Sequence, residues 1–502
     1  MGFILNRCQS IFMELNLNKV SLKHYYSKLS YKDLIIFLIP VIIFSYYLWV
    51  FDPGILRYDS FNQFHQIASH HFTNWHPFFH TFIEMVLLKI YPSPVSVCIF
   101  QILTFSVIWM MICNHFRYEG ENANGISRLF IVQVLFTLII CLIPINAVFS
   151  ITLLKDILFG YYFLLFTFLI AVLLDKKGEV RTEFLIIMPL VMAFIVGLRP
   201  NGFHIIVISL IILTAYFFRK KYNLKTIVII VSLTVVFILL IASLNVAFDV
   251  TNNQKAPIYA KASHMLADYD LNLTLTPQDS TALHKLMNES TIKDNYQITF
   301  SDPMYFMSNK SVFDHDKSTY RDMAIKYSIQ NPDHFIKYLF CASPIVWDVT
   351  REDSWVGEQY YVNLELDKNR YFSNHPTFNM TDFENVSSKN IGTSQFDSLN
   401  NYIEMFKHNL ILDSLFNSPA LYMYLSFILV GAIYLITRSK EIFMIYLPNL
   451  INIAIIFFST PIQDNRYLYP NLLVAYFLII MLIGIIAKKK LNNEKIIEFN
   501  RN

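Results

Sequence analysis

The sequence predicts an all-α protein that crosses a membrane about ten times and carries a large domain outside the bilayer. Of its 502 residues, 55% are hydrophobic and only 15% are charged, against roughly 25% charged residues in soluble domains. The mean hydropathy is +0.42. Apolar runs recur along the chain, and many approach the length of about 20 residues that an α-helix needs to cross a bilayer.

We expect ten spans, several of them short, in two transmembrane modules at 34–248 and 418–487. Between the modules, the polar and Asn-rich segment 249–417 is expected to form an extracytoplasmic domain, α-rich or mixed. Within it, 281–292 and 319–340 look helical and 351–398 looks loop-rich. The expected spans are 34–51, 95–113, 128–149, 157–174, 184–197, 203–218, 226–248, 419–436, 441–459 and 467–487.

The apolar stretch 77–91, PFFHTFIEMVLLKIY, is short for a span. It carries His80, Glu84 and Lys89 at spacings of four and five, which we expect to share roughly one helical face. We therefore interpret it as an amphipathic helix in the membrane interface, ended by Pro92 and Pro94. With the polar stretch before it, this helix forms an outer loop at 52–94.

Basic residues set the orientation, because cytoplasmic loops are enriched in Lys and Arg. If 77–91 does not cross, the tails 1–33 and 488–502 are both cytoplasmic and every basic cluster falls on that side. The net charge is only +3, and its distribution indicates membrane orientation, with membrane lipids as partners and no nucleic acid. The clusters are Lys19–Lys32, Arg117 with Arg128, Lys176–Arg181, Arg219–Lys225, Arg438 with Lys440, and Lys488–Lys490.

Cysteine usage excludes two kinds of site. Only Cys341 of the five cysteines lies in 249–417, so this domain cannot hold an internal disulfide. No cysteine spacing resembles a metal site. Histidines 65, 70 and 71 are interpreted as solvated, since adjacent side chains such as those of His70 and His71 point apart.

The outer loops carry cations against the orientation rule, and charges at a membrane boundary suggest function. Arginine and lysine there would suit an anionic ligand such as a lipid phosphate, with carboxylates for acid–base work or for a metal. The charged residues are Asp52, Arg57 and Asp59 in the first loop, Lys155 and Asp156 in 150–156, Arg199 in 198–202, and Asp464 and Arg466 in 460–466.

Each of these residues also has a structural interpretation. Asp59 fits a helix cap as well as a catalytic group. Lys155 and Asp156 fit an interfacial anchor and a cap, and Arg199 fits snorkelling to head groups. His76 fits packing at a helix start. Singly, these interpretations suffice for most residues, but four outer loops with such clusters jointly favour an anion-binding site.

The pattern resembles the GT-C superfamily of integral-membrane glycosyltransferases, including protein O-mannosyltransferases and lipid A aminoarabinose transferases. Asp59 in RYDSFNQ, the tripeptide Trp75-His76-Pro77 and Lys155-Asp156 match motifs of that superfamily in order. The segments LRPNG at 198–202 and Asp464-Asn465-Arg466-Tyr467 resemble an uncharacterised bacterial branch. The resemblance covers roughly 30–250 and 419–487. Asp59 lacks an adjacent second acid and Phe78 replaces a second proline, which disfavours a protein acceptor.

The resemblance implies an inverting transfer from a polyprenyl-phosphate sugar to a glycan or lipid acceptor in a bacterial cell envelope. Asp59 would be the general base. Arg199, with Lys155 or Arg466, would hold the phosphate. Asp156 would orient the acceptor or a cation, and His76 would bind phosphate or position Asp59. No cofactor is certain, and a divalent cation is compatible but not required. Further substrate contacts are expected from Arg57, Asn201, Asp464 and Tyr467, and saccharide stacking from Trp347 and Trp355.

Two other functions stay open. A polysaccharide polymerase or ligase using a lipid-diphosphate oligosaccharide also has about ten spans and a large late outer loop, but would not need Asp59. A transporter or flippase for lipid-linked sugars predicts inverted repeats and polar residues in the middle of the membrane. Neither feature is evident in the sequence.

Overall fold

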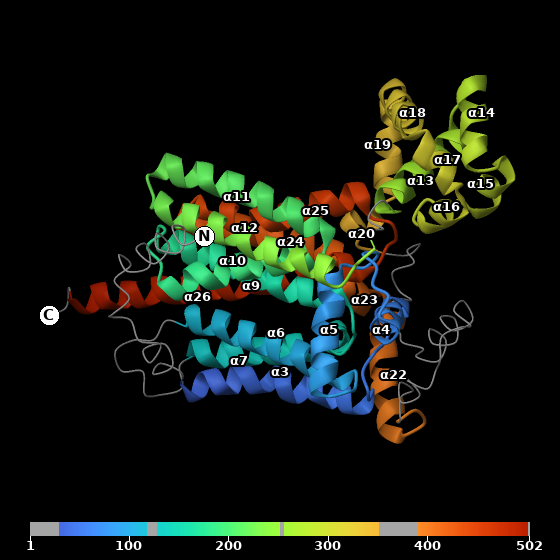
Figure 1. The fold of residues 1–502 in the computed structure, drawn as a ribbon. Helices are drawn as coiled ribbons and strands as arrows, with labels where there is room; N and C mark the ends of the chain where they lie inside the picture. The colour runs from blue at the N-terminus through green and yellow to red at the C-terminus, as the bar shows by residue number, and fades with distance from the viewer. Residues whose placement is uncertain (1–29, 118–127, 252–255, 351–389, 500–502) are drawn as a thin grey trace, which may run out of the picture.

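The computed structural model describes residues 30–117, 128–251, 256–350 and 390–499. Helices dominate this part of the chain, which contains no strand and only isolated bridges. The prediction of an all-α, multi-pass membrane protein is confirmed. The long helices run side by side as a bundle (Figure 1).

Eight helices in the described residues are long and apolar enough to cross a membrane. The bent pair α7 (Arg128–Leu142) and α8 (Pro144–Ser150) would make a ninth, and α10 (Thr182–Leu198) is a shorter apolar helix. The eight are α3 (Tyr31–Val50), α6 (Val95–His115), α9 (Lys155–Asp175), α11 (Pro200–Lys220), α12 (Leu224–Ala247), α24 (Pro419–Thr437), α25 (Glu441–Ser459) and α26 (Tyr469–Phe499), the last counted over Tyr469–Lys490.

The segment expected as one span at 128–149 bends by 72° between α7 and α8. Pro144 is the first residue of α8, where its fixed φ suits a helix start and its missing N–H is no loss. The last span also differs from expectation, because α26 begins at Tyr469 and continues through the basic residues to Phe499.

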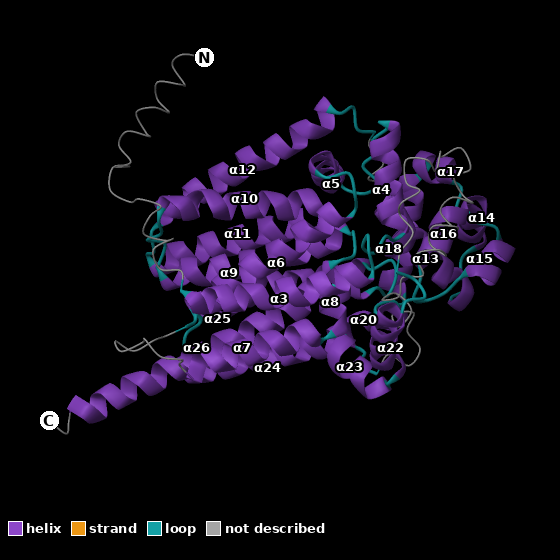
Figure 2. Ribbon diagram, turned by 90° about the horizontal axis from the view of Figure 1, so that it is seen from below, coloured by secondary structure: helices purple, strands orange, loops and turns teal. Residues whose placement is uncertain are grey.

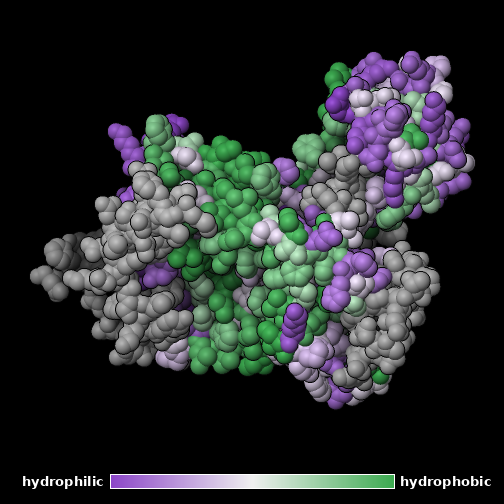
Figure 3. All heavy atoms as spheres, in the orientation of Figure 1, coloured by the Kyte–Doolittle hydropathy of each residue, from purple (hydrophilic) through white to green (hydrophobic). Residues whose placement is uncertain are grey.

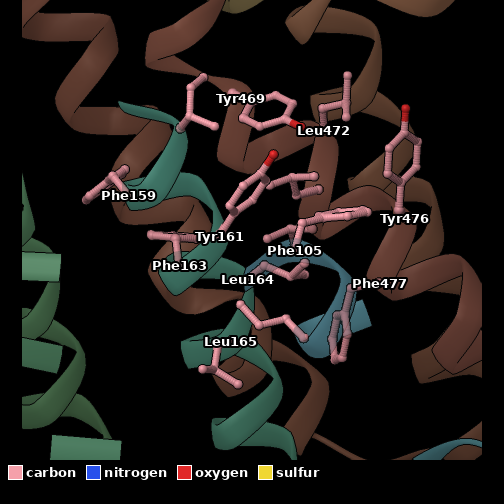
Figure 4. Packing of buried hydrophobic residues seen from close by; sticks show 14 of the residues in the cluster. Phe105, Phe159, Tyr161, Phe163, Leu164, Leu165, Tyr469, Leu472, Tyr476 and Phe477 are labelled. Carbon is pink, nitrogen blue, oxygen red and sulfur yellow. The ribbon is translucent and has the colours of Figure 1, made fainter. Parts of the chain in front are cut away.

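The centre of the bundle is α9, which contacts α6, α10, α25 and α26. It is apolar on all sides, as expected of a helix surrounded by protein. Aromatic rings fill the space around it: Tyr161 lies 5.3 Å from Phe105 and 6.2 Å from Tyr469 between ring centroids (Figure 4). Gly160 fits closely against the Tyr469 ring. This packing fixes the ends of α9 relative to α26.

Helix α5 (Phe78–Ile90) lies across the ends of the bundle helices, as two perpendicular views agree (Figures 1 and 2). The expectation that His80, Glu84 and Lys89 share one face of this helix is wrong. His80 and Glu84 are fully buried against the bundle, whereas Lys89 is exposed. Nine residues at about 100° each place Lys89 about 180° from His80, so only the first two share a face.

The described part of the segment 249–417 contains a hydrophilic group of short helices, set beside the apolar bundle (Figures 1 and 3). It has its own core, which includes Leu266, Tyr269 and Met304. Its helices are α13 (Ala256–Asn272), α14 (Pro277–Leu286), α15 (Glu289–Asn295), α16 (Asp302–Met307), α17 (Lys310–His315), α18 (Lys317–Gln330), α19 (Pro332–Cys341) and α20 (Pro344–Trp347).

Each helix expected in this domain is divided. The stretch 281–292 breaks before Glu289, and 319–340 breaks at Asn331, since Pro332 starts a new helix. Most of the stretch expected to be loop-rich lies outside the described residues, but 394–398 is helical. It belongs to α22 (Ser394–His408), which is followed by α23 (Leu410–Asn417).

Candidate functional site

Charged residues from the four loops 52–94, 150–156, 198–202 and 460–466 meet at one end of the bundle. A bridge between two loops brings Asp59 to Lys155: the Ile55 N–H donates to the Ile151 carbonyl at 2.8 Å, and Leu153 N–H donates back to Ile55 at 2.9 Å. The Ser60 hydroxyl also donates to the Leu153 carbonyl at 2.6 Å. These contacts set α4 (Tyr58–Ser69), with Asp59 in its first turn, beside the start of α9.

The Asp59 carboxylate is surrounded by nitrogen atoms from three other segments. Arg466 Nη1 lies 2.8 Å from Asp59 Oδ2, and Lys155 Nζ lies 3.4 Å from the same oxygen. His76 Nε2 lies 3.9 Å from Asp59 Oδ1. The Lys155 ammonium also reaches His76 Nδ1 at 3.3 Å. Asp59 is therefore the meeting point of residues almost 400 positions apart in the chain.

Asp156 lies beneath this group, in the first turn of α9, where the helix dipole favours an anion. Its carboxylate lies 3.1 Å from Arg199 Nε, 3.7 Å from Lys155 Nζ and 4.0 Å from Arg466 Nε. No hydrogen bond to the described residues satisfies either Asp156 oxygen, or the buried Nη1 of Arg199. The lower part of the cluster thus holds its charges by ion pairing alone.

The chain places Arg199 at a tight corner. This residue ends α10 and caps α11, and Pro200 occupies the first turn. Any Cβ at Gly202 would collide with the Ile195 carbonyl, so the two helices can approach only because position 202 is glycine. The LRPNG segment is therefore more than an ordinary turn: it directs a nearly buried arginine into the cluster.

Arg466 and Arg199 share one aromatic ring. The Tyr467 centroid lies 5.0 Å from the Arg199 guanidinium and 5.2 Å from that of Arg466, within cation–π range. Asp464 accepts from the Arg466 backbone N–H at 3.0 Å and pairs with its Nε at 2.8 Å. These contacts hold Arg466, on the short 3-10 turn η4 (Asn465–Tyr467), near the like charge of Arg199 at the start of α11.

Exposure divides the cluster into two layers. The side chains of Asp59, Arg466 and Lys155 keep exposures of 18%, 16% and 14%, whereas Asp156 has none. A ligand can therefore reach the upper layer of Asp59, Lys155 and Arg466. Asp156 forms the floor that positions the cations.

Protonation follows from burial and charge. Burial raises the pKa of Asp59, but the charges of Arg466 and Lys155, together with that of His76 when acid protonates it, outweigh burial and hold this pKa well below its ordinary value. Burial lowers the pKa of His76 to about 4. At neutral pH the imidazole is uncharged, so its Nδ1 can accept from Lys155. The three carboxylates Asp59, Asp156 and Asp464 then balance three cations.

Four other residues predicted to contact substrate are Arg57, Asn201, Trp347 and Trp355. Arg57 caps α4, and its backbone N–H donates to the Ser60 hydroxyl at 3.0 Å. Asn201 is in the first turn of α11 and makes no hydrogen bond to the cluster among the described residues. Trp355 lies outside the described residues, and the Trp347 indole donates to the Phe340 carbonyl at 2.9 Å. Within the described residues no group of three His, Cys, Asp or Glu side chains could hold a metal ion.

Asp302 is a neighbour of the cluster that sequence reasoning missed, since Ser301-Asp302-Pro303 looks like an ordinary helix start. Burial raises its pKa to about 6, with the Asp59 charge adding to this and Arg466 opposing it. It makes no ion pair or hydrogen bond with the described residues. Asp302 is therefore a carboxyl group near the cluster, and its oxygen atoms accept no hydrogen bond from the described residues of the cluster.

A second polar group lies on α5. His80 Nδ1 lies 3.1 Å from Gln63 Oε1 and 3.5 Å from Glu84 Oε1, and Gln63 donates to the Thr81 hydroxyl at 2.9 Å. Burial lowers the pKa of His80 to about 3 and raises that of Glu84 well above its ordinary value. His80 is neutral at pH 7, and burial favours the neutral form of Glu84. The network of Gln63, Thr81, His80 and Glu84 joins α4 to α5.

Comparisons of the chain with protein-family models, with curated proteins and with solved structures found no match.

Proposed function

We propose that this chain is a membrane glycosyltransferase that moves a sugar from a polyprenyl-phosphate donor to an acceptor at the outer face of the membrane. In this proposal α7–α8 and α10 complete ten spans, both termini are cytoplasmic and α5 lies in the interface. The observation that carries it is the convergence of Lys155 and Arg466 on Asp59, with Arg199 paired to the neighbouring Asp156, at one end of the bundle.

The cations suit the leaving phosphate. A sugar phosphodiester carries one negative charge, and a second develops as the sugar departs, so cations placed there stabilise the transition state more than the ground state. The accessible groups are Lys155 and the Arg466 guanidinium, and the partly unpaired Arg199 lies behind them. Bound donor would compete with Asp59 for these partners.

This competition gives Asp59 its role. Without donor, its lowered pKa makes it a weak base. When Lys155 and Arg466 turn to the phosphate, the carboxylate loses the charges that stabilise its ionised form, and its basicity rises. Asp59 then takes the proton of the acceptor hydroxyl. The acceptor oxygen then bonds to the anomeric carbon while the bond between that carbon and the phosphate oxygen breaks. The electron pair of the broken bond leaves with the phosphate.

Asp156 acts differently in this proposal from the expectation that it orients substrate. Because it is fully buried and surrounded by all three cations, it positions them and does not contact the reacting atoms. His76, neutral and in contact with Lys155, positions that lysine between Asp59 and the phosphate.

One observation favours a second function, transport of a lipid-linked sugar. Asn449 and Asn452 lie in the middle of α25, fully buried, with side-chain amides that no hydrogen bond satisfies in the described residues. Polar residues inside a span are typical of transport paths. The expectation that such residues are lacking is wrong for this helix.

The test is a transfer assay with the full chain in nanodiscs. The donors are a panel of polyprenyl-phosphate sugars and the acceptors are cell-envelope glycans and lipids. Release of free polyprenyl phosphate by the wild type, lost in Asp59→Asn and kept in the exposed control Asp322→Asn, would support the transferase. Transbilayer movement of intact donor without release would favour transport, and turnover of only a diphosphate-linked oligosaccharide would favour a polymerase.

A further inference from the structure

An aromatic surface lies next to the charged cluster. The Trp75 ring is 42% exposed, and its centroid lies 5.8 Å from that of Tyr305 and 6.3 Å from that of Phe306. The Trp75 ring is tilted by 38° and 32° to these two rings. Phe306 is 60% exposed, whereas Tyr305 is buried beneath it. Two elements more than 200 residues apart thus build one exposed aromatic face.

Covalent continuity and packing place this face beside Asp59. Trp75 directly precedes His76, whose ring faces the Asp59 carboxylate. Helix α16 carries Tyr305 and Phe306, and its first residue is Asp302. The preceding Ser301 N–H donates to the Pro461 carbonyl at 2.8 Å, which attaches α16 to the loop that carries Arg466. Three to four helical residues separate Asp302 from the rings, a rise of about 5 to 6 Å.

We propose that Trp75, Phe306 and Asp302 form the acceptor subsite and that its ligand is a saccharide. This rests on the proposed function and assigns the acceptor as a glycan and not a lipid. Aromatic rings offer an apolar surface to the C–H face of a sugar ring, as binding sites commonly combine apolar walls with a few polar groups. The Asp302 carboxylate accepts hydrogen bonds from hydroxyl groups.

The surroundings of the face disfavour other ligands. Tyr305 and Phe306 lie on α16, one of the short helices beside the bundle, whose surface is mostly hydrophilic (Figure 3). A carboxylate at its edge repels a lipid phosphate. The face is formed by a few side chains, far smaller than a stable protein–protein interface. Lys310, whose Nζ lies 4.5 Å from the Tyr305 centroid, bounds it on one side.

Direct binding tests the subsite independently of catalysis. The full chain in nanodiscs is studied by saturation-transfer NMR with neutral, amino-sugar and uronic-acid hexasaccharides, and with a short-chain lysophospholipid. We expect transfer to ring protons of at least one saccharide. Phe306→Ala and Trp75→Ala should weaken its binding by about five- to tenfold, the size of one aromatic contact.

Three further variants interpret the result. Trp75→Phe should restore most of the affinity, which a general disturbance of the loop would not allow. Ile329→Ala, which removes an exposed apolar side chain from α18, should change nothing. Asp59→Asn should still bind saccharide although it does not transfer sugar. Binding therefore tests the subsite separately from the transferase proposal. Saturation transfer to no saccharide, or to the lysophospholipid alone, would overturn the inference. So would saccharide binding by Phe306→Ala that equals binding by the wild type.

Discussion

Asp59 and Asp156 lie at the same end of the bundle and share two cations, Lys155 and Arg466, yet their surroundings differ. Asp59 stands on α4, outside the bundle, and keeps 18% of its side chain exposed. Asp156 stands on the most deeply buried helix and is inaccessible. The comparison teaches that charge pairing alone does not distinguish a reacting carboxylate from a supporting one. Accessibility does, and on that ground we propose Asp59 as the reacting carboxylate.

The largest expected effect is that of Asp59→Asn on transfer. Removing a general base lowers the rate by about 100- to 10,000-fold. Thermal stability should change little, because Lys155 and Arg466 are partly exposed and water can replace the lost carboxylate. Initial rates and melting temperatures measure both quantities. A rate within tenfold of the wild type would remove Asp59 as the base.

Asp156→Asn should show the opposite balance. Removing one member of a buried ion pair leaves Arg199 uncompensated, at a cost of about 3–5 kcal/mol. We expect a clearly lower melting temperature in nanodiscs, with reduced transfer as a consequence. The exposed Asp322→Asn is the matched control and should melt like the wild type. Normal stability with abolished transfer would reverse the roles of the two carboxylates.

The acid range gives a third test, on the acceptor side. The pKa of Asp302 is raised to about 6, so this group gains its proton as the pH falls through about 6 and loses acceptor capacity. Saccharide affinity should therefore fall about tenfold at most between pH 7 and pH 5. Asp302→Asn should be weak and flat across this range. Two charged groups act on Asp302, namely Asp59 and Arg466, and both keep their charge between pH 7 and pH 5. The pKa of His76 is only about 4, below this range. A steep profile in Asp302→Asn would contradict this assignment.

A smaller effect on acceptor affinity is expected where the bundle contacts the short helices α13 to α20. Gln463 is fully buried and donates to the carbonyls of Thr299 and Ala342, both at 3.1 Å, while it accepts from the Ile345 N–H at 3.0 Å. Gln463→Ala leaves buried backbone groups unpaired, at about 1–3 kcal/mol each. We expect a higher KM for the acceptor and a similar KM for the donor. Equal changes in both would show that Gln463 supports the whole fold.

The sequence predicted the membrane helices because burial in lipid requires long apolar runs, which any reader of the chain can count. It also selected Asp59, Lys155, Arg199 and Arg466, since a charge on an outer loop is visible without a fold. The sequence did not reveal residues whose place in the site depends on contacts between distant segments. The neighbourhood of Asp302 depends on the attachment of α16 to Pro461, and no local pattern records that contact.

The buried layer was also beyond the sequence. His80 and Glu84 looked like the polar side of an interfacial helix, because ionisable residues usually face water. Their burial depends on α5 turning this face toward the bundle, with Gln63 accepting from the His80 ring. The bend at Pro144 shows the same limit, since one continuous apolar run does not reveal that two helices meet at 72°.

The most direct test of the account is the affinity of Asp59→Asn for polyprenyl phosphate, measured by ³¹P NMR titration in nanodiscs beside the wild type. If Lys155 and Arg466 exchange Asp59 for the phosphate, removing the competing carboxylate should tighten binding by about tenfold while transfer is lost. Weaker binding by the variant, or an unchanged affinity, would contradict an anion site at Asp59.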